Sequence, residues 1–180
     1  LTNGFQAYGF ETVMTYLVEK YVLGQSCVSD QQEEKLRIRV EGFRKLAIGT
    51  SAPGFDAVDS GGNLIRLAEN GGRRTLLIFW SGECPHCEAV MPELKALYGR
   101  YGDKVRFIGI SVDSEENVWR SALEKNDLPW INIAELKGWD GKIVQDYFVY
   151  ATPTFLLLDD TLKIIAKPNG MAELKGLLMN

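Results

Sequence analysis

The sequence predicts an α/β domain, with a central mixed sheet flanked by helices, preceded by a helical extension. The apolar run over 75–80 is typical of a strand that is buried on both faces. Helical and strand patterns alternate after it, and strand–helix–strand units pair their strands in parallel through right-handed crossovers. Two apolar segments divided by a turn over 154–166 predict a closing antiparallel hairpin. The sheet is therefore expected to be mixed.

Residues 1–48 are expected to be helical. Apolar side chains recur there at three- and four-residue steps in two stripes, namely Ala7, Phe10, Met14, Leu17 and Tyr21, then Leu36, Val40, Phe43 and Ala47. Gly24 marks the end of the first helix, and Ser29 with Gln32 has the spacing of a capping box. We interpret the segment as a helical hairpin that packs on the main domain, and an arm that binds a partner is the alternative.

The composition changes near residue 48, where turn-forming residues over 49–55 indicate a linker. We therefore divide the chain into a helical extension, 1–48, and a domain, 49–180. The elements expected in the domain are a hairpin over 55–58 and 64–67, a strand over 75–80, a helix from Pro85 to Tyr101, a strand over 105–112, a helix opened by Ser114, a short helix over 143–147, a hairpin over 154–158 and 162–166, and a helix over 171–178.

Composition and charge exclude several classes of protein. Hydrophobic residues make up 46% of the chain and charged residues 24%, as in ordinary globular proteins. A net charge of −4 without any basic run argues against a nucleic-acid partner. No apolar stretch reaches the roughly 18 residues that a membrane helix requires. The start shows no signal peptide, although a mature or trimmed chain would have lost one.

Three cysteines are present, and two of them form the motif Cys84-Pro-His-Cys87 at the predicted start of a helix. The free N–H groups and the dipole of a helix N-terminus stabilise a thiolate, the form of cysteine that attacks disulfides. We expect Cys84, at the very start, to be the exposed nucleophile. Cys87, one turn further in, is then expected to resolve the mixed disulfide.

The neighbouring residues are expected to tune this dithiol. Pro85 fixes the backbone for helix entry, and His86 favours the Cys84 thiolate by its charge or by donating a hydrogen bond. Glu83 disfavours a second negative charge beside it. We expect the helix and His86 to outweigh Glu83, which can point to water. The pair should then be more oxidising than a Cys-Gly-Pro-Cys dithiol.

The main alternative for this motif is half of a structural zinc site. Zinc takes four ligands, whereas this chain has one histidine, inside the motif itself, and one further cysteine. We therefore favour redox chemistry and expect neither a metal nor a cofactor. Cys27 is interpreted as an incidental free thiol, with a role as a third redox thiol as the minor alternative.

Four segments together resemble the TlpA/ResA group of thioredoxin-like proteins, namely Trp80-Ser-Gly-Glu-Cys84-Pro-His-Cys87, Met91-Pro92, Ile110-Ser-Val-Asp113 and Tyr150-Ala-Thr-Pro-Thr154. The resemblance covers Ser51 to Leu178, with the motifs in the same order and at the same spacing. The helical residues before Ser51 resemble extensions on multi-domain members from Bacteroidetes-type bacteria.

The resemblance implies a thioredoxin fold in which Pro153 is cis and lies beside the dithiol. Trp80, Thr152 and Pro153 would then contact the substrate, with Thr152 presenting its backbone to a substrate strand. It also implies protein thiols and disulfides as substrates, a periplasmic or cell-envelope location, and a membrane-bound reductase as electron donor. Nothing in the sequence sets the oligomeric state.

Two departures from the resemblance concern the proton on Cys87. Many thioredoxins carry a buried acid six residues before the first cysteine, and here that residue is Ile78. ResA-type proteins carry a glutamate three residues after the second cysteine, where this chain has Val90. Glu83, Glu88 or water are the candidate substitutes. Glu83 also replaces the tryptophan that often precedes the first cysteine.

Exchange or reduction of disulfides in exported proteins is the function that we favour. One alternative is a thiol peroxidase of the peroxiredoxin-like type, because Ser81-x-x-Cys84 faintly resembles the peroxidatic Thr-x-x-Cys. Another is a non-catalytic module that binds cysteine-bearing partners through a groove at Pro153. The second cysteine at Cys87 favours dithiol exchange over both.

Overall fold

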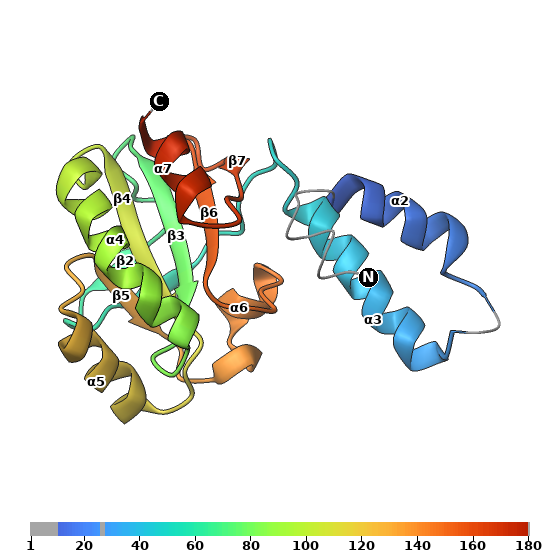
Figure 1. Cartoon of the computed structure of the whole chain (residues 1–180), viewed down its shortest axis with the longest axis horizontal. Coiled ribbons are helices and arrows are strands. Elements are labelled where there is room, and N and C mark those ends of the chain that lie inside the picture. Colours follow the sequence, from blue (N-terminus) through green and yellow to red (C-terminus); the bar gives the residue numbers. More distant parts are fainter. Residues whose placement is uncertain (1–10, 26–27, 180) are drawn as a thin grey trace.

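The computed structural model describes residues 11–25 and 28–179. It begins with two helices, α2 (Glu11–Tyr21) and α3 (Asp30–Lys45), which extend away from the remainder of the chain (Figure 1). Ala7 and Phe10, assigned above to the first apolar stripe, lie outside the described residues.

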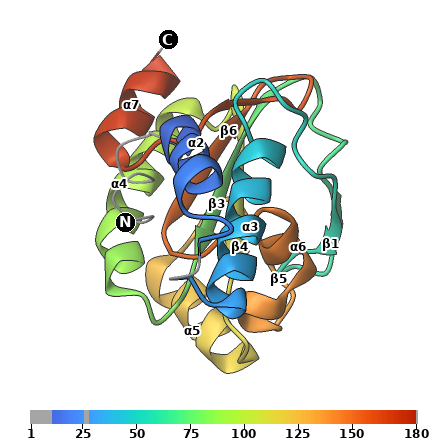
Figure 2. The same cartoon turned by 90° about the vertical axis from the view of Figure 1, so that its right-hand side faces the viewer.

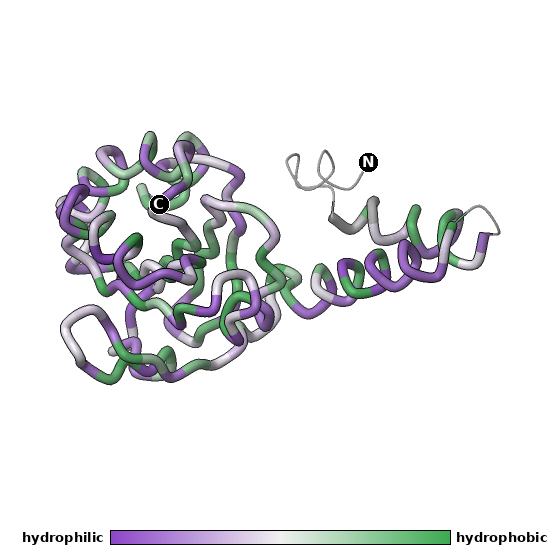
Figure 3. Tube along the Cα trace, turned by 90° about the horizontal axis from the view of Figure 1, so that it is seen from below, coloured by the Kyte–Doolittle hydropathy of each residue, from purple (hydrophilic) through white to green (hydrophobic). Residues whose placement is uncertain are grey.

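The capping box predicted at the start of α3 is confirmed. The Ser29 side chain accepts a hydrogen bond from the Gln32 N–H, and the Gln32 side chain accepts one from the Ser29 N–H. Between the two helices, Val18 and Val40 are buried against partly buried neighbours, which makes a small separate cluster. Figure 3 shows hydrophilic and hydrophobic positions alternating along α3, as expected for a helix with one packed face.

A five-stranded mixed sheet forms the centre of the domain, in the order β5-β4-β3-β6-β7. The parallel strands are β3 (Arg74–Trp80), β4 (Val105–Ser111) and β5 (Ile131–Ala134). The antiparallel strands are β6 (Thr154–Leu158), beside β3, and β7 (Ile164–Ala166) at the edge. The sheet is therefore mixed, as predicted.

Helices cover both faces of this sheet (Figures 1 and 2). On one face lie α4 (Pro85–Tyr101), α5 (Glu116–Asn126) and α7 (Met171–Met179), whose apolar side chains join one core cluster. On the other face, α6 (Lys142–Asp146) and the end of a short hairpin contribute to a second cluster. The hairpin consists of β1 (Asp56–Val58) and β2 (Leu64–Arg66).

The strand β3 shows why an uninterrupted apolar run was informative. Leu76, Ile78 and Trp80 point into the cluster under α4, while Leu77 and Phe79 point into the opposite cluster. None of the five is more than 1% exposed. Because β3 lies between β4 and β6, its end is held on both sides, and the dithiol follows directly from that fixed end.

The elements match the expected order apart from the short 3₁₀ helix η1 (Gly138–Asp140), which was not expected, and two further differences. The strand β5 was not expected, because INIA is only four residues long and follows a proline and a tryptophan without periodicity. The start of α5 was expected at Ser114, whereas the N-cap is Glu115, without a side-chain capping bond. Within the described part of the chain, no helix has both the length and the apolarity to cross a membrane.

Candidate active site

The dithiol lies where β3 passes into α4, at the carboxyl edge of the sheet. Cys84 is the N-cap of α4, with extended backbone angles, and Pro85 occupies the first helical turn, where no N–H is needed. The N–H of Cys87 donates to the sulfur of Cys84 at 3.3 Å. The sulfur thus takes the place that a serine or aspartate oxygen usually occupies at a helix start. Both cysteines are free thiols.

Cys84 is partly exposed, and the pKa of its thiol lies below the ordinary value. Partial burial raises this pKa, but hydrogen bonds to the sulfur outweigh it. They come from the side chains of Cys87 and Thr152 and from the backbone N–H groups of Cys87 and His86. The backbone N–H groups of the helix terminus are thus among the groups that favour the thiolate.

Cys87 has the opposite environment, although it lies only one turn away. Its side chain is 0% exposed. Burial raises the pKa of its thiol to about 12, and the hydrogen bond that it shares with Cys84 acts in the same direction. A backbone hydrogen bond from Ser81 lowers it only in part. Cys87 is therefore a protonated thiol at neutral pH.

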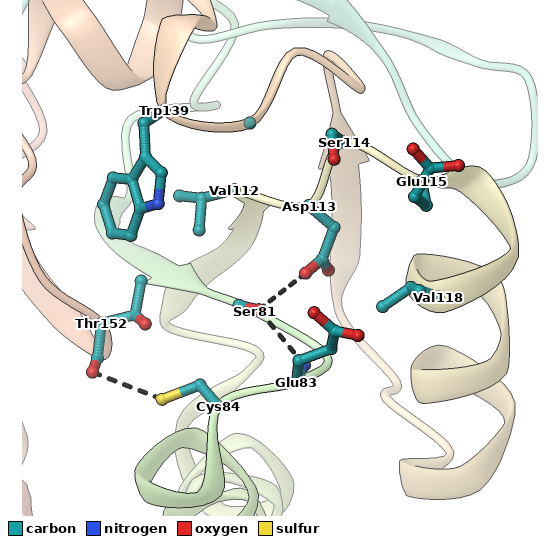
Figure 4. Close-up of a pocket in the computed structure, with 11 residues that line it drawn as sticks. Ser81, Glu83, Cys84, Val112, Asp113, Ser114, Glu115, Val118, Trp139 and Thr152 are labelled. Carbon is teal, nitrogen blue, oxygen red and sulfur yellow. Dashed lines mark hydrogen bonds between the residues drawn. The ribbon is translucent and has the colours of Figure 1, made fainter.

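The Thr152–Pro153 peptide is cis, as the resemblance implied. Thr152 lies beside the dithiol, because the Cys84 thiol donates to the Thr152 carbonyl at 3.5 Å (Figure 4). That contact favours the protonated thiol, whereas the Thr152 side chain favours the thiolate. The segment leads directly into β6, which pairs with β3. The sheet therefore brings these distant parts of the sequence together.

A buried carboxylate fixes the loop before Cys84. Asp113, 6% exposed, accepts a hydrogen bond from the Ser81 hydroxyl at 2.6 Å and one from the Gly82 N–H at 3.0 Å. Its other contact is the Ser111 hydroxyl, at 2.7 Å. Asp113 belongs to the motif Ile110-Ser-Val-Asp113, but the motif alone predicts no role for its carboxylate. A signal was available, because Ser111 is the last residue of β4, beside the end of β3, and Asp113 follows two residues later.

The residues predicted to tune the dithiol are all exposed, namely Glu83, Pro85 and His86. His86 contributes its backbone N–H to the Cys84 sulfur. Figure 4 shows the Glu83 carboxylate directed toward Val118, away from that sulfur. This orientation agrees with the expectation that Glu83 can turn away from the thiolate.

Neither position at which an acid could have accepted the Cys87 proton carries one. Ile78 is fully buried and Val90 is half-buried against the same core. Glu88, a candidate substitute, forms an ion pair with Lys125 on α5. Trp80, named above as a substrate contact, is 1% exposed and packs in the core. Because its indole is buried, this placement corrects the expectation and makes Trp80 part of the support under the loop.

A cavity of about 400 Å³ opens beside Cys84 (Figure 4). Its lining includes Cys84, Thr152 and the loop before the helix, together with the start of α5. Trp139 also lines it, from the short 3₁₀ helix η1 (Gly138–Asp140) between β5 and α6. The sequence analysis did not single out Trp139, since nothing local links it to a motif more than fifty residues earlier.

Cys27 lies outside the described residues, so its interpretation stays a prediction. Among the residues that are described, no three His, Cys, Asp or Glu side chains gather as a metal site would require.

Two thiols of unequal pKa at a helix start, with a cis-proline segment against the exposed one, define a thioredoxin-like oxidoreductase. The AhpC/TSA family profile matches residues 48–167, and the chain belongs to this family. Among curated relatives, thiol-disulfide oxidoreductase ResA of Bacillus thuringiensis is 33% identical over 127 residues, 70% of this chain and 72% of the relative.

Solved structures agree with this class. A thiol-disulfide oxidoreductase from Bacteroides fragilis is 31% identical, with a TM-score of 0.63 over 71% of this chain and 99% of its own. A thioredoxin-like protein from Bacteroides caccae is 24% identical, with a TM-score of 0.75 over 94% of this chain and 61% of its own. The second likeness concerns the fold alone, and it extends into the helices before residue 48. The chain is thus an enzyme of the thiol–disulfide oxidoreductase class.

Proposed function

We propose that this protein exchanges or reduces disulfides in exported proteins through Cys84 and Cys87. The observation that carries the proposal is the contrast between the two sulfurs. One is partly exposed with a lowered pKa, and the other is buried with a pKa of about 12. Such a pair provides an attacking thiolate and a protonated partner held in reserve.

The reaction proceeds in two exchanges. The Cys84 thiolate attacks one sulfur of a substrate disulfide, breaks that bond, and forms a mixed disulfide while the other substrate sulfur leaves as a thiolate. Cys87 then loses its proton and attacks the Cys84 sulfur, which releases the second substrate thiolate. Two electrons pass to the substrate, and the enzyme is left with a Cys84–Cys87 disulfide. Protons from Cys87 and from water complete the two substrate thiols.

Proton release from Cys87 is the step with least support from neighbouring groups. Its pKa is high because it is buried and shares a hydrogen bond with Cys84. Once Cys84 is in a mixed disulfide, it carries no thiolate charge, so one of the causes that raise the pKa of Cys87 disappears. With Ile78 and Val90 in place of acids, we propose that water accepts this proton.

The peroxidase alternative has weaker support. In that interpretation the Ser81 hydroxyl would serve the reactive sulfur. Instead, it donates to Asp113 and accepts the Glu83 N–H at 3.2 Å. Its role is to hold the loop in place.

Location and electron supply complete the proposal. ResA-type relatives and the exported context of the resemblance support a periplasmic or cell-envelope location, with a membrane-bound reductase that returns electrons to the oxidised pair. The division into an extension, 1–48, and a thioredoxin-like domain, 49–180, stays a prediction. Cysteine-bearing proteins are the proposed substrates.

The test measures three activities on the same reduced protein. We expect catalysis of insulin reduction by dithiothreitol and no turnover of hydrogen peroxide above that of a free dithiol. We also expect a Cys84–Cys87 disulfide in the oxidised product, identified by mass spectrometry. Insulin activity that survives Cys84→Ser would refute the proposed mechanism. Turnover of peroxide would favour the peroxidase, and binding of cysteine-bearing proteins without turnover would favour the binding module.

A further inference from the structure

We infer that the groove around Trp139 selects protein disulfides whose attacked cysteine is flanked by a basic residue on one side and an apolar residue on the other. This inference rests on the proposed function and concerns the substrate of that same site. The observation that carries it is a pair of hollows that share Trp139 as a lining residue. The occupant is an extended stretch of the oxidised substrate, passing over the Cys84 sulfur.

The first hollow is the cavity of about 400 Å³ that contains the Cys84 sulfur. Along its wall, Figure 4 shows the carboxylates of Glu83 and Glu115 near Val118. Both glutamates are exposed, and no lysine or arginine is among the described residues that line the hollow. The buried Asp113 is occupied with the loop and is not available to a ligand. A basic side chain beside the attacked cysteine therefore complements this wall.

The second hollow has a volume of about 170 Å³ and is also lined by Trp139. Apolar and aromatic side chains make most of its lining, with Val144, Phe148, Val149 and Tyr150 among them. Tyr150 is 43% exposed and lies two residues before Thr152. The hollow is therefore within reach of a residue next to the attacked cysteine and suits an apolar side chain.

Trp139 is the residue common to both hollows. The residue is 45% exposed, and Figure 4 shows its indole projecting from η1 toward the side where Thr152 lies. An exposed tryptophan offers a large apolar surface at little cost in conformational entropy, and such residues often dominate binding energy. The chain has Glu83 where a tryptophan often precedes the first cysteine. Trp139 supplies an aromatic contact from another part of the fold.

The segment that carries Trp139 is fixed before any substrate binds. The Glu135 carboxylate accepts the N–H groups of Lys142 at 3.0 Å and Ile143 at 2.7 Å, which anchors the start of α6. The Gln145 amide donates to the Trp139 carbonyl at 2.6 Å. Little ordering of the groove is therefore needed on binding, which favours affinity.

The charge arm of the test uses short peptides with one cysteine, protected as its neutral mixed disulfide with 2-mercaptoethanol. Lysine, glutamine or glutamate flanks the cysteine, on each side in turn. We expect the reduced protein to react about fivefold faster with the lysine peptide than with the glutamate peptide when the flanking residue stands on at least one of the two sides of the cysteine. The ratio corresponds to two exposed charge pairs, between the lysine and the two glutamates of the wall. The ratio should shrink at high salt. Mass spectrometry follows the oxidation of Cys84.

Variants then assign this ratio to the groove. The double variant Glu83→Gln/Glu115→Gln should bring the lysine-to-glutamate ratio close to one. Glu124→Gln, an exposed glutamate on α5 that does not line the hollow, should leave the ratio unchanged. Using a ratio within each variant removes any general change in the reactivity of Cys84. A double variant that keeps the wild-type ratio would overturn the charge assignment.

The apolar arm compares leucine with serine at the flank opposite the lysine. Wild type should favour leucine about threefold, which corresponds to burial of part of one side chain. Trp139→Ala should remove that preference and Trp139→Phe should keep most of it. Tyr21→Ala, which removes an exposed aromatic from α2, is the control. Equal rates for leucine and serine in wild type would contradict this half of the inference.

Failure of the inference and failure of the proposed function look different. The small neutral disulfide of 2-mercaptoethanol makes no use of the hollows, and its reaction with the dithiol reports the chemistry alone. Reaction with this reagent combined with peptide rates that ignore both flanks would overturn the groove and keep the oxidoreductase. No reaction with either would overturn both.

Discussion

The first turn of α4 places a cysteine at each of its ends, and the two cysteines differ in exposure and in the direction of their pKa shifts. At the entrance, Cys84 is partly exposed and receives hydrogen bonds from the helix terminus and from Thr152, which lower its pKa. One turn inside, Cys87 is fully buried, and its pKa rises to about 12. Position along one turn thus separates the two sulfurs by exposure and by pKa, which is the contrast that the proposed roles of attacking and resolving thiol require. The two residues are chemically identical, so the difference between them comes from their surroundings.

The comparison also shows what this enzyme lacks on the buried side. Cys84 is surrounded by hydrogen-bond donors, whereas Ile78 and Val90 occupy the two positions near Cys87 where the family resemblance leads us to expect an acid. We therefore expect attack by Cys84 to be easy and resolution by Cys87 to be the slower exchange. Substitutions at each end of this turn should therefore have different effects.

Removing either sulfur should give qualitatively different enzymes. Cys84→Ser should abolish insulin reduction, because no thiolate remains at the entrance. Cys87→Ser should still attack and then accumulate a mixed disulfide with the substrate, visible on a non-reducing gel. The double variant is the control for non-specific adducts. Adducts on Cys87 in the Cys84→Ser variant, formed as fast as those on Cys84, would reverse the assignment.

Alkylation of the reduced protein should separate the two thiols by about a hundredfold at neutral pH. A pKa of about 12 leaves Cys87 with roughly 3,000-fold less thiolate than an ordinary thiol, and its greater nucleophilicity restores about fortyfold. The Cys84 rate should rise with pH and level off below the pKa of a free cysteine. Iodoacetamide labelling read by mass spectrometry gives both profiles. Faster labelling of Cys87 would contradict the assignment.

Asp113→Asn should weaken the hydrogen bonds that hold the loop before Cys84 and leave the surroundings of Cys87 unchanged. The amide group cannot accept all the bonds that the carboxylate accepts, so the protein should lose about 1–3 kcal/mol of unfolding free energy. Because the loop before Cys84 is then held less firmly, the pH profile of Cys84 labelling should shift toward higher pH, while Cys87 stays unreactive. Chemical denaturation and the same alkylation assay measure these effects. Asp127→Asn, at an exposed side chain, is the control, with a change below about 0.5 kcal/mol.

The smallest effects should come from the exposed neighbours of Cys84. We propose that the dithiol has a potential between that of thioredoxin, about −270 mV, and that of DsbA, about −120 mV. His86→Ala should raise the pKa of Cys84 and make the pair more reducing, and Glu83→Ala should do the reverse. Each change should be about threefold in the equilibrium constant with glutathione, about 14 mV, because exposed charges are screened.

A glutathione titration, with thiolate absorbance followed against pH, measures both properties. If both variants match wild type, the helix terminus and Thr152 alone set the chemistry of the entrance.

Local patterns made the elements around the dithiol predictable. The buried run of β3, the proline at the start of α4 and the capping box of α3 each have a signal within a few residues. The cis-proline followed from the family resemblance, and its place beside Cys84 depends on the pairing of β3 with β6. What the sequence analysis missed depends on tertiary structure. The short edge strand β5 has no periodicity, and Trp139 reaches the cavity only because η1 follows that strand.

Trp80 shows the limit of reading a role from a motif. A tryptophan four residues before Cys84 looked like a surface for substrate, but strand alternation turns it into the core. Asp113 shows the converse. Its carboxylate is buried, yet it holds the loop on which the reactive cysteine depends.

One contact of the extension bears on how this protein can change over evolution. Gly42 on α3 lies against Phe148, so close that an added Cβ would come within 2.5 Å of the ring. Phe148 has a positive φ of 46°, a conformation that few phenylalanines adopt, and it lines the second hollow beside Trp139. Replacing this glycine would displace the ring and reshape the hollow. Substitution at Gly42, which is distant in sequence from Cys84 and Cys87, is therefore constrained by the hollow that we propose to contact the substrate.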